Sequence, residues 1–297
     1  PLNNWGAIGV ESIEVEEFGY AASFSLAQDI AERAELDQLQ LVWQAATGSE
    51  MAYQPRHTTD EPVTGVPSSM QGWQRLLDLL EERTDAEYSD LWQKWVVNKI
   101  QLPLLATRQS ARHQYAEVVE AAGAWELPQT IRSRMGAWEF DAVNIALSEA
   151  AAVLEDRQDI ESLAAELDLA PPGVLREAFE SNDGMAAATT EAAVEIETME
   201  KLGDATDRLD VPGLLASIGL LGRDLQSELT AARAAFSDGD LTAAAQAATQ
   251  VVDASDDAAD AGRVRVAVGG ASLLLLDGIG MGILFSRRRR GQRAPCQ

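Results

Sequence analysis

The apolar stretch over residues 266–286, followed directly by four arginines at positions 287–290, constrains this chain most. A helix of that length, at about 1.5 Å per residue, crosses a hydrocarbon core of ~30 Å. Asp277 lies near its middle, where a carboxylate costs about 3 kcal/mol on the insertion scale. A buried C-terminal helix is the alternative, but it leaves the abrupt arginine cluster without an explanation. We therefore predict a transmembrane helix with a basic tail over residues 263–297.

The arginines stand on one side of the stretch only, and such clusters favour the cytoplasmic side of a membrane. We therefore expect a single-pass protein of the cell membrane, with residues 1–262 extracytoplasmic and the C-terminus in the cytoplasm. The chain opens with Pro1-Leu2-Asn3-Asn4-Trp5 and shows no initiator methionine or signal peptide. Because an outward-facing body needs an export signal upstream, we expect the chain to be a fragment.

The charge balance excludes one class of partner. The chain holds 48 acidic and 23 basic residues, a formal net charge of -25. Phosphate backbones are bound by basic surfaces, and the sequence has no basic cluster outside the tail, so nucleic acid is not expected as a partner. Cys296 is the single cysteine, which excludes an internal disulfide.

Hydrophobic periodicity predicts helices in the first hundred residues. One helix is expected to begin around Phe18, and a second to begin near Asp37 and end at Gly48. Residues 47–71 have little periodicity and contain several prolines, which predicts a loop. Helical spacing resumes at Trp73, and Thr84 with Glu87 predicts a capping box for the next helix. The apolar face expected for the first helix comprises Phe18, Ala21, Ala22, Leu26, Ala27, Ile30 and Ala34.

Residues 99–262 also read as successive helices. A helix is predicted from Leu102 to Ala122, and Pro128 is expected at the start of the next. Two stretches align, one at Trp138 and one at Phe236, each an aromatic turn leading into an alanine-rich helix. They predict helical hairpins. The expected fold class is all-α, a helical bundle or hairpin array with a C-terminal transmembrane helix, in which residues 99–262 form a stalk.

Four stretches in the first hundred residues together resemble a known family. They are Tyr20-Ala21-Ala22-Ser23 opening an apolar helix, a second helix ending near Trp43, Leu76-Leu77-Asp78-Leu79-Leu80-Glu81-Glu82-Arg83-Thr84, and Leu91-Trp92-Gln93-Lys94-Trp95-Val96. In this order they resemble the C-terminal part of a gluzincin catalytic domain of the aminopeptidase N type. The resemblance covers roughly residues 15–98, and we assign residues 1–98 to an incomplete domain of this kind. Ala22 and Ser23 depart from the lysine and glycine usual in that family.

The resemblance implies a zinc metallopeptidase acting on a peptide or protein substrate. The zinc-binding His-Glu-x-x-His motif is absent here, and the two histidines, His57 and His113, are too far apart in sequence to replace it. No metal ligand and no cofactor is therefore assigned to this chain, and zinc is implied only for the complete protein. By resemblance, Tyr20 is the catalytic candidate, its phenol donating to the oxyanion of the tetrahedral intermediate. The alternative is a tyrosine at a helix start, packed half-buried in the core.

Two hypotheses of function remain at this point. In the first, the chain is the C-terminal fragment of a membrane-anchored, extracytoplasmic zinc metallopeptidase-like protein whose zinc site lies upstream. In the second, it is a non-enzymatic extracytoplasmic helical scaffold or pseudo-peptidase that presents a binding surface. Activity is not expected from this chain alone under either hypothesis. A His-Glu-x-x-His motif upstream of Pro1 would decide in favour of the enzyme.

Overall fold

The computed structural model describes residues 1–6, 8–54, 72–210, 217, 219 and 223–289, with side chains as far as residue 267 except residue 259. Within these ranges the elements are helices and no strand occurs, which confirms the all-α class for the described residues. The elements are η1 (Leu2–Asn4), α1 (Ile13–Arg33), α2 (Leu36–Thr47), α3 (Gly72–Thr84), α4 (Ser89–Leu91), η2 (Trp92–Val96), α5 (Leu102–Ala122), α6 (Gln129–Gly136), α7 (Phe140–Leu167), α8 (Val174–Glu180), α9 (Met185–Asp210), α11 (Leu225–Ser237) and α12 (Leu241–Arg289).

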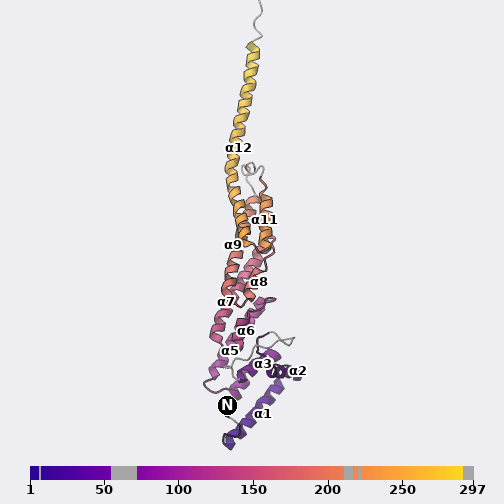
Figure 1. Ribbon diagram of the computed structural model, residues 1–297, viewed down its shortest axis with the longest axis vertical. Coiled ribbons are helices and arrows are strands. Elements are labelled where there is room, and N and C mark those ends of the chain that lie inside the picture. Colours follow the sequence, from indigo (N-terminus) through magenta and orange to yellow (C-terminus); the bar gives the residue numbers. More distant parts are fainter. Residues whose placement is uncertain (7, 55–71, 211–216, 218, 220–222, 290–297) are drawn as a thin grey trace, which may run out of the picture. The chain divides into compact units, whose positions relative to one another are not determined.

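The described elements form two compact units (Figure 1). Unit 1 comprises residues 1–157 and 175–191, and unit 2 comprises residues 158–174 and 192–297. Helices α7 and α9 each contribute residues to both units. The domain limits at residues 98 and 262 remain predictions from the sequence.

Helix α1 starts earlier than its periodicity predicts. The hydroxyl of Ser12 accepts a hydrogen bond from the backbone N–H of Val15 and so caps the helix at Ile13. The expected start around Phe18 is therefore wrong by more than one turn. Tyr20, expected at the opening of this helix, instead lies in its third turn. A polar N-cap, which the apolar pattern cannot register, decides where the helix begins.

Helix α2 and the segment after it follow the expected course. A reciprocal capping box between Glu35 and Gln38 opens α2, and Gly48 ends it as predicted. Residues 49–54 then lie against α3. The guanidinium of Arg75 donates to the carbonyl oxygen of Glu50 at 2.8 Å, and that of Arg83 donates to the Glu50 carboxylate at 3.1 Å. The remainder of the predicted loop, residues 55–71, lies outside the described residues.

The capping box predicted between Thr84 and Glu87 does not form. Thr84 is the last residue of α3, and Asp85 ends the helix with a left-handed φ of 52°. The Thr84 hydroxyl donates back to the carbonyl of Leu80 at 2.8 Å and lies 3.0 Å from the hydroxyl of Tyr88. Thr84 therefore closes α3, because its hydroxyl is used by the turn that precedes it.

The remaining helices of unit 1 begin close to the predicted positions. Helix α5 has the predicted bounds Leu102–Ala122, and Pro128 is the N-cap of α6, one residue before the first helical position. Trp138 has a left-handed φ of 62° and forms the aromatic turn into α7. The largest buried apolar side chains of this unit come from α3, η2, α6, α7 and α8: Leu77, Leu79, Leu80, Trp92, Ile131, Met135, Leu147, Leu154 and Phe179.

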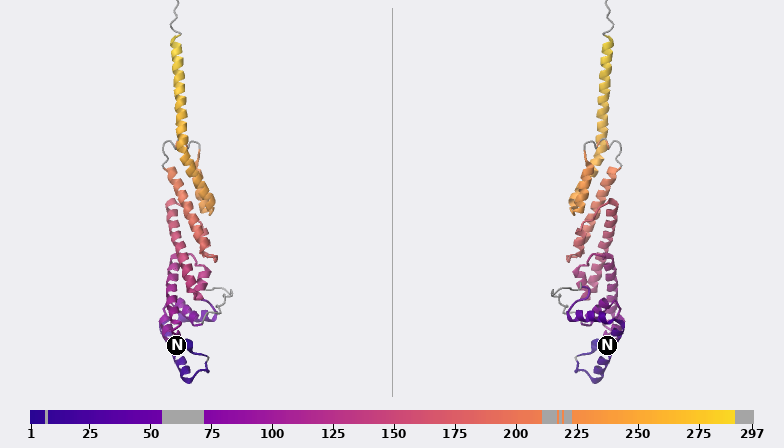
Figure 2. Two further views of the ribbon diagram at one scale, coloured as in Figure 1. Left: turned by 90° about the vertical axis from the view of Figure 1, so that its left-hand side faces the viewer. Right: turned by 90° about the vertical axis from the view of Figure 1, so that its right-hand side faces the viewer.

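Unit 2 contains the second predicted hairpin. Gly239, with a φ of 84°, forms the turn between α11 and α12, and these helices lie side by side in Figures 1 and 2. The buried residues of α11 recur every three to four positions, as the amphipathic pattern predicts. They are Leu225, Leu229, Ala232 and Phe236, and on α12 they are matched by Leu241, Ala244, Ala248 and Val251. Asp210-Val211-Pro212 also predicts the start of a helix that ends near Gly222, and this segment lies largely outside the described residues.

Helix α12 continues through most of the predicted membrane segment. It has 49 residues, about 73 Å at ~1.5 Å per residue, and its second half extends beyond α11 (Figure 2). In the part of the chain whose side chains are described, no helix has an apolar stretch long enough to cross a bilayer. Most of the predicted span, residues 268–286, lies outside that part.

Candidate functional site

Tyr20, the residue singled out by the resemblance, is half exposed on α1. Its side chain is 55% exposed, and its ring meets that of Trp5 edge to face with 5.2 Å between centroids. Trp5 also covers Gly19, where an added Cβ would lie only 2.4 Å from the indole ring. Among the described residues the Tyr20 hydroxyl has no hydrogen-bond partner. Trp5 therefore packs against the ring of Tyr20, while the hydroxyl remains available for a hydrogen bond.

The histidines form no metal site in the described part of the chain. The ring of His113 is on the surface of α5, with its Nδ1 atom 3.4 Å from a Glu117 carboxylate oxygen. His57 lies outside the described residues. Among the described residues, no group of three histidine, cysteine, aspartate or glutamate side chains lies close enough to hold a metal ion. These residues do not fit a zinc ion.

The most concentrated chemistry in unit 1 is a buried ion cluster between α3 and α5. Asp78 and Arg108 are both 1% exposed, and the Nε atom of Arg108 donates to Oδ1 of Asp78 at 2.7 Å. Arg108 also donates from Nη1 to Oε2 of Glu81 at 2.5 Å. The second oxygen of Asp78 accepts from the indole N–H of Trp138 at 2.6 Å. Each carboxylate oxygen in the pair therefore has a donor.

Further hydrogen-bond donors extend the cluster toward the segment after α2. Arg112 lies one turn after Arg108 on α5, with its Nε atom 3.2 Å from Glu81. It also donates to the hydroxyl of Tyr53 at 3.0 Å, and that hydroxyl lies 3.4 Å from Asp78. The other oxygen of Glu81 accepts from the backbone N–H of Tyr88 at 2.9 Å. Buried charges thus join four parts of unit 1: α3, α5, the segment after α2 and the turn before α4.

The pKa shifts in this cluster follow from its burial. Removal from water raises the pKa of Asp78, although the Arg108 guanidinium and the Trp138 N–H favour the ionised form. Burial likewise raises the pKa of the Tyr53 phenol, and the neighbouring Asp78 charge adds to the effect. Burial is the largest single effect and disfavours the charged form of Arg108, but its acidic neighbours, Asp78 and Glu81 among them, together outweigh burial and raise the pKa of Arg108. Tyr53 therefore stays neutral and Arg108 stays charged at any physiological pH.

The cluster is better suited to holding helices than to catalysis. The Ser89 hydroxyl donates to Glu81 at 3.2 Å, which resembles a nucleophile beside a base. Glu81, however, also faces Arg108 and Arg112, so its negative charge is already committed to two cations. Removing one partner of such a buried pair costs about 3–5 kcal/mol, because a charge is left uncompensated. The packing of α3 against α5 therefore depends on the charges of the cluster staying paired.

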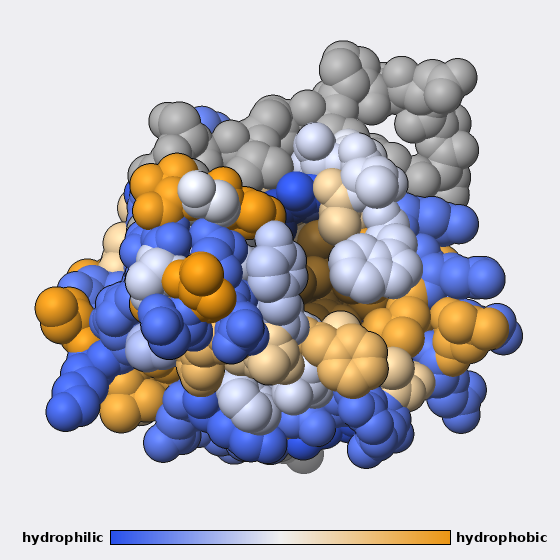
Figure 3. All heavy atoms as spheres, turned by 90° about the horizontal axis from the view of Figure 1, so that it is seen from below, coloured by the Kyte–Doolittle hydropathy of each residue, from blue (hydrophilic) through white to orange (hydrophobic). Residues whose placement is uncertain are grey.

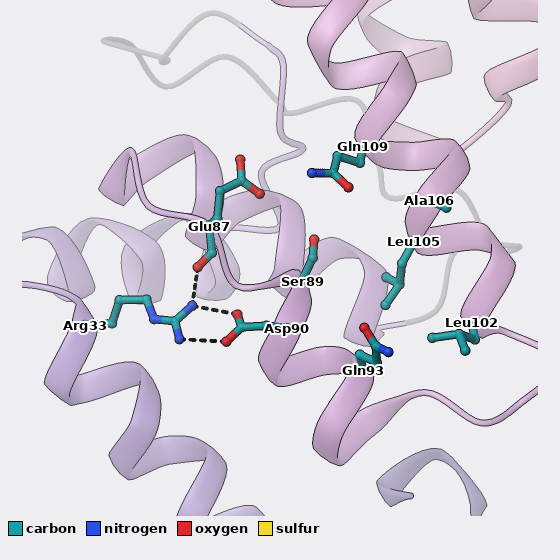
Figure 4. A pocket seen from close by; sticks show the side chains of 9 residues that line it. All are labelled: Arg33, Glu87, Ser89, Asp90, Gln93, Leu102, Leu105, Ala106 and Gln109. Carbon is teal, nitrogen blue, oxygen red and sulfur yellow. Dashed lines mark hydrogen bonds and ion pairs between the residues drawn. The ribbon is translucent and has the colours of Figure 1, made fainter.

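A cavity of about 620 Å³ lies between the end of α1, the α4–η2 segment and α5 (Figure 4). At its edge the Arg33 guanidinium forms a bidentate ion pair with Asp90 at 2.7 and 2.9 Å and donates to the carbonyl of Glu87. This pair raises the pKa of Arg33 and lowers that of Asp90. One wall is apolar and the facing one carries amide, hydroxyl and carboxylate groups; the lining residues are Arg33, Glu87, Ser89, Asp90, Gln93, Leu102, Leu105, Ala106 and Gln109.

Large apolar side chains are exposed on α1 and α2. Ile13 is 74%, Phe24 72% and Leu36 73% exposed. Figure 3 shows the end of the molecule where these helices lie, with hydrophobic side chains interspersed among hydrophilic ones on its surface. The whole set on the two helices is Ile13, Val15, Phe18, Tyr20, Phe24, Leu36, Leu41 and Trp43. The periodicity predicted Phe18 within a buried face, but half of its side chain is exposed.

Sequence reasoning overlooked the buried ion cluster, although a signal was present. Asp78 and Glu81 are three positions apart within a run of buried leucines, and Arg108 and Arg112 are four apart on another helix. Those spacings place each pair on one helix face. Charges of opposite sign on two apolar faces would have indicated a pairing between the helices.

Comparisons of the sequence and structure with protein families, curated proteins and solved structures returned no match. The resemblance to gluzincins therefore rests on the four stretches quoted above alone.

Proposed function

We propose that this chain is an extracytoplasmic helical scaffold, anchored in the cell membrane through the end of α12, which presents α1 and α2 to a protein partner. The supporting observation is the set of large apolar side chains that these two helices expose. Exposed aromatic and aliphatic side chains that gather on one surface commonly serve in recognition. The same unit buries and pairs its charges, so the exposure does not reflect a poorly formed core.

The attachment of α1 to the rest of unit 1 fits this role. Its fully buried helical residues are small, Gly19 and Ala22. Polar contacts hold the other end: Arg33 pairs with Asp90, and Asp29 accepts from the indole N–H of Trp95 at 3.1 Å. Small buried residues on one side and large exposed ones on the other are the reverse of an ordinary amphipathic core helix.

Unit 2 supplies the spacer in this proposal. Helix α12 begins in the hairpin with α11 and extends well past it toward the predicted span at residues 266–286. With the arginines at positions 287–290 in the cytoplasm, residues 1–262 would lie outside the membrane. The acidic charge of the chain would keep the body away from anionic headgroups.

A photo-reactive amino acid placed on α1 or α2 tests the proposal in the cells that make the protein. We expect such a substitution at Phe24 on α1 or at Trp43 on α2 to give a discrete crosslinked adduct with another protein. Ile145 on α7 is the matched control, because it is a large apolar residue of unit 1 that is 64% exposed. Equal adducts at Ile145 and Phe24, or none at Phe24 and Trp43, would contradict the proposal.

A second candidate is favoured by the position of Tyr20. Its hydroxyl has no partner among the described residues, and its ring is fixed by Trp5, as an oxyanion donor would require. We propose as this alternative that the chain closes the catalytic domain of a membrane-anchored, zinc-dependent peptidase. An upstream segment would then supply the His-Glu-x-x-His motif and cover α1. The photo-crosslinker at Phe24 separates the candidates, because here the adduct would form within the protein's own chain.

A further inference from the structure

The outward side of α1 carries a heptad-like spacing. At 100° per residue, positions separated alternately by four and three residues share one side of a helix. The side of α1 opposite Gly19 and Ala22 follows this rule over its whole length, and all of its members are exposed: Ile13, Glu17, Tyr20, Phe24, Ala27 and Ala31. We call these six residues the α1 seam. Such a spacing is what a second helix packs against, and in the described part of the chain Trp5 contacts the seam at Tyr20.

The seam changes in size along its length. Its first half carries the large side chains Ile13, Tyr20 and Phe24, and its second half carries Ala27 and Ala31. Alanines allow the backbone of another helix to approach closely, while large side chains need recesses opposite them. A partner helix would therefore present small residues to the first half and large apolar residues to the second.

The charge around the seam identifies the chemistry of the partner. Helix α1 itself carries five acidic residues, Glu14, Glu16, Glu17, Asp29 and Glu32, and one basic residue, Arg33. Asp29 is paired with Lys94. Arg33 is engaged by Asp90 and does not face the seam. Acidic residues near a helix start can be explained by the helix dipole, which accounts for Glu14 but not for Glu32 in the last turn. A partner with lysine or arginine beside its apolar positions would complement this field.

A second copy of this chain fits the seam poorly. In a parallel arrangement Glu17 would face the same residue of the other copy. In an antiparallel arrangement the glutamates of the first turns would approach Glu32 and Glu35. Like charges at these flanking positions oppose pairing.

Resting on the proposed scaffold function, we propose that the α1 seam docks a basic amphipathic helix, with apolar residues in three-four spacing and lysine or arginine at the flanks. Binding follows the helix-in-groove mode, in which apolar anchors supply most of the affinity. The acidic flanks guide the encounter and select the partner against acidic helices.

Labelled model peptides test this chemistry on the full chain in detergent. The basic peptide matches α1 in length, 21 residues, with alanine opposite the first half of the seam, leucine opposite the second half and lysine at the flanks. One comparison peptide carries glutamate in place of lysine, and another carries serine in place of leucine. Fluorescence anisotropy should show the basic peptide binding roughly tenfold or more tightly than either, and its affinity should fall as salt is added. Equal binding of the acidic peptide would overturn the assigned chemistry.

Substitutions locate the binding on the seam. Phe24→Glu should weaken the affinity for the basic peptide by roughly tenfold or more, because it removes an apolar anchor. Ile145→Glu, an equivalent change on α7, should leave the affinity within about twofold. Circular dichroism and thermal unfolding check that both variants remain folded, as expected for exposed positions. Equal effects of the two changes would overturn the location. Self-association of the full chain that is abolished by Phe24→Glu would also overturn the proposal, because a second copy would then occupy the seam.

These results are distinguishable from failure of the scaffold function itself. If the crosslinker at Phe24 captures another protein while the acidic peptide binds as well as the basic one, the scaffold stands and the partner chemistry is wrong. If the crosslinker captures nothing and no peptide binds, both proposals fail.

Discussion

Arg108 on α5 lies 2.7 Å from Asp78 on α3, thirty positions earlier in the chain, and each side chain is 1% exposed. This contact removes two opposite charges almost completely from water. Because the desolvation of both ions is offset only while they remain together, the pair makes the packing of α3 against α5 specific. The contact also orders the surroundings, since Trp138 and Tyr53 turn their polar atoms toward it.

Asp78→Asn tests the weight of this pair. The amide keeps the shape of the side chain but leaves Arg108 facing only Glu81, so we expect a loss of about 3–5 kcal/mol in the free energy of unfolding of unit 1. Denaturant unfolding followed by tryptophan fluorescence gives the value. Asp90→Asn is the matched control, because it breaks the more exposed pair with Arg33 and should cost under about 1 kcal/mol. Similar small losses for both variants would show that the buried pair contributes little.

The attachment of α1 should depend on acid pH. The N–H of Trp95 lowers the pKa of Asp29, and the guanidinium of Arg33 lowers that of Asp90. A carboxyl whose folded pKa is depressed contributes stability that is present above its ordinary pKa, about 3.9, and is lost as the pH falls through the folded value. We therefore expect α1 to loosen below about pH 4, before the buried core of unit 1 opens.

Hydrogen exchange measures this loosening helix by helix. After correction for intrinsic rates, the amides of α1 should lose protection as the pH falls below about 4, while those of α5 keep theirs. A variant carrying both Asp29→Asn and Asp90→Asn should exchange rapidly in α1 at neutral pH and show a weaker acid transition. Protection of α1 that stays constant as the pH falls would mean that other contacts hold the helix.

The sequence predicted some elements well and others poorly, for identifiable reasons. Helix α5 was predicted with its observed bounds, because Pro103 and Gly123 mark its ends and the apolar spacing is regular between them. The start of α1 was missed because Ser12 acts through one hydrogen bond and leaves no trace in the periodicity. Local signals carry such information only when the capping residue is considered along with the apolar pattern.

Burial was harder to predict than helix formation. Two sides of α1 have helical apolar spacing, one through Phe18 and Ala22 and the other through Tyr20 and Phe24. Only the tertiary structure selects the first as the inner side. Even then Phe18 remains half exposed. The ion cluster was missed for a related reason, since Asp78 and Arg108 read as solvated positions until their helices are placed together.

The predicted anchor gives a test of topology. A reporter that is active only in the cytoplasm, fused after Gln297, should be active, and protease added outside the cell should remove the body of the chain. Asp277→Leu should make insertion more favourable by about 3 kcal/mol, because a carboxylate at the centre of the span is replaced by an apolar group. An inactive reporter together with a protected body would show that the orientation is wrong.

Tyr20→Phe decides between a catalytic and a packing role for this residue. The change removes one hydroxyl and keeps the ring against Trp5, so unit 1 should stay folded. If an upstream segment completes a zinc site, the variant of the full-length protein should hydrolyse a peptide substrate roughly a hundredfold more slowly, the scale seen when one oxyanion donor is lost. Binding of a ground-state inhibitor should change little, since the hydrogen bond matters most in the transition state. Tyr115→Phe provides the matched control, because it removes the hydroxyl of a part-buried tyrosine elsewhere in unit 1 and should leave turnover unchanged. Turnover at the wild-type rate in Tyr20→Phe would leave the tyrosine as a packing partner of Trp5, and the scaffold would then be the function to pursue.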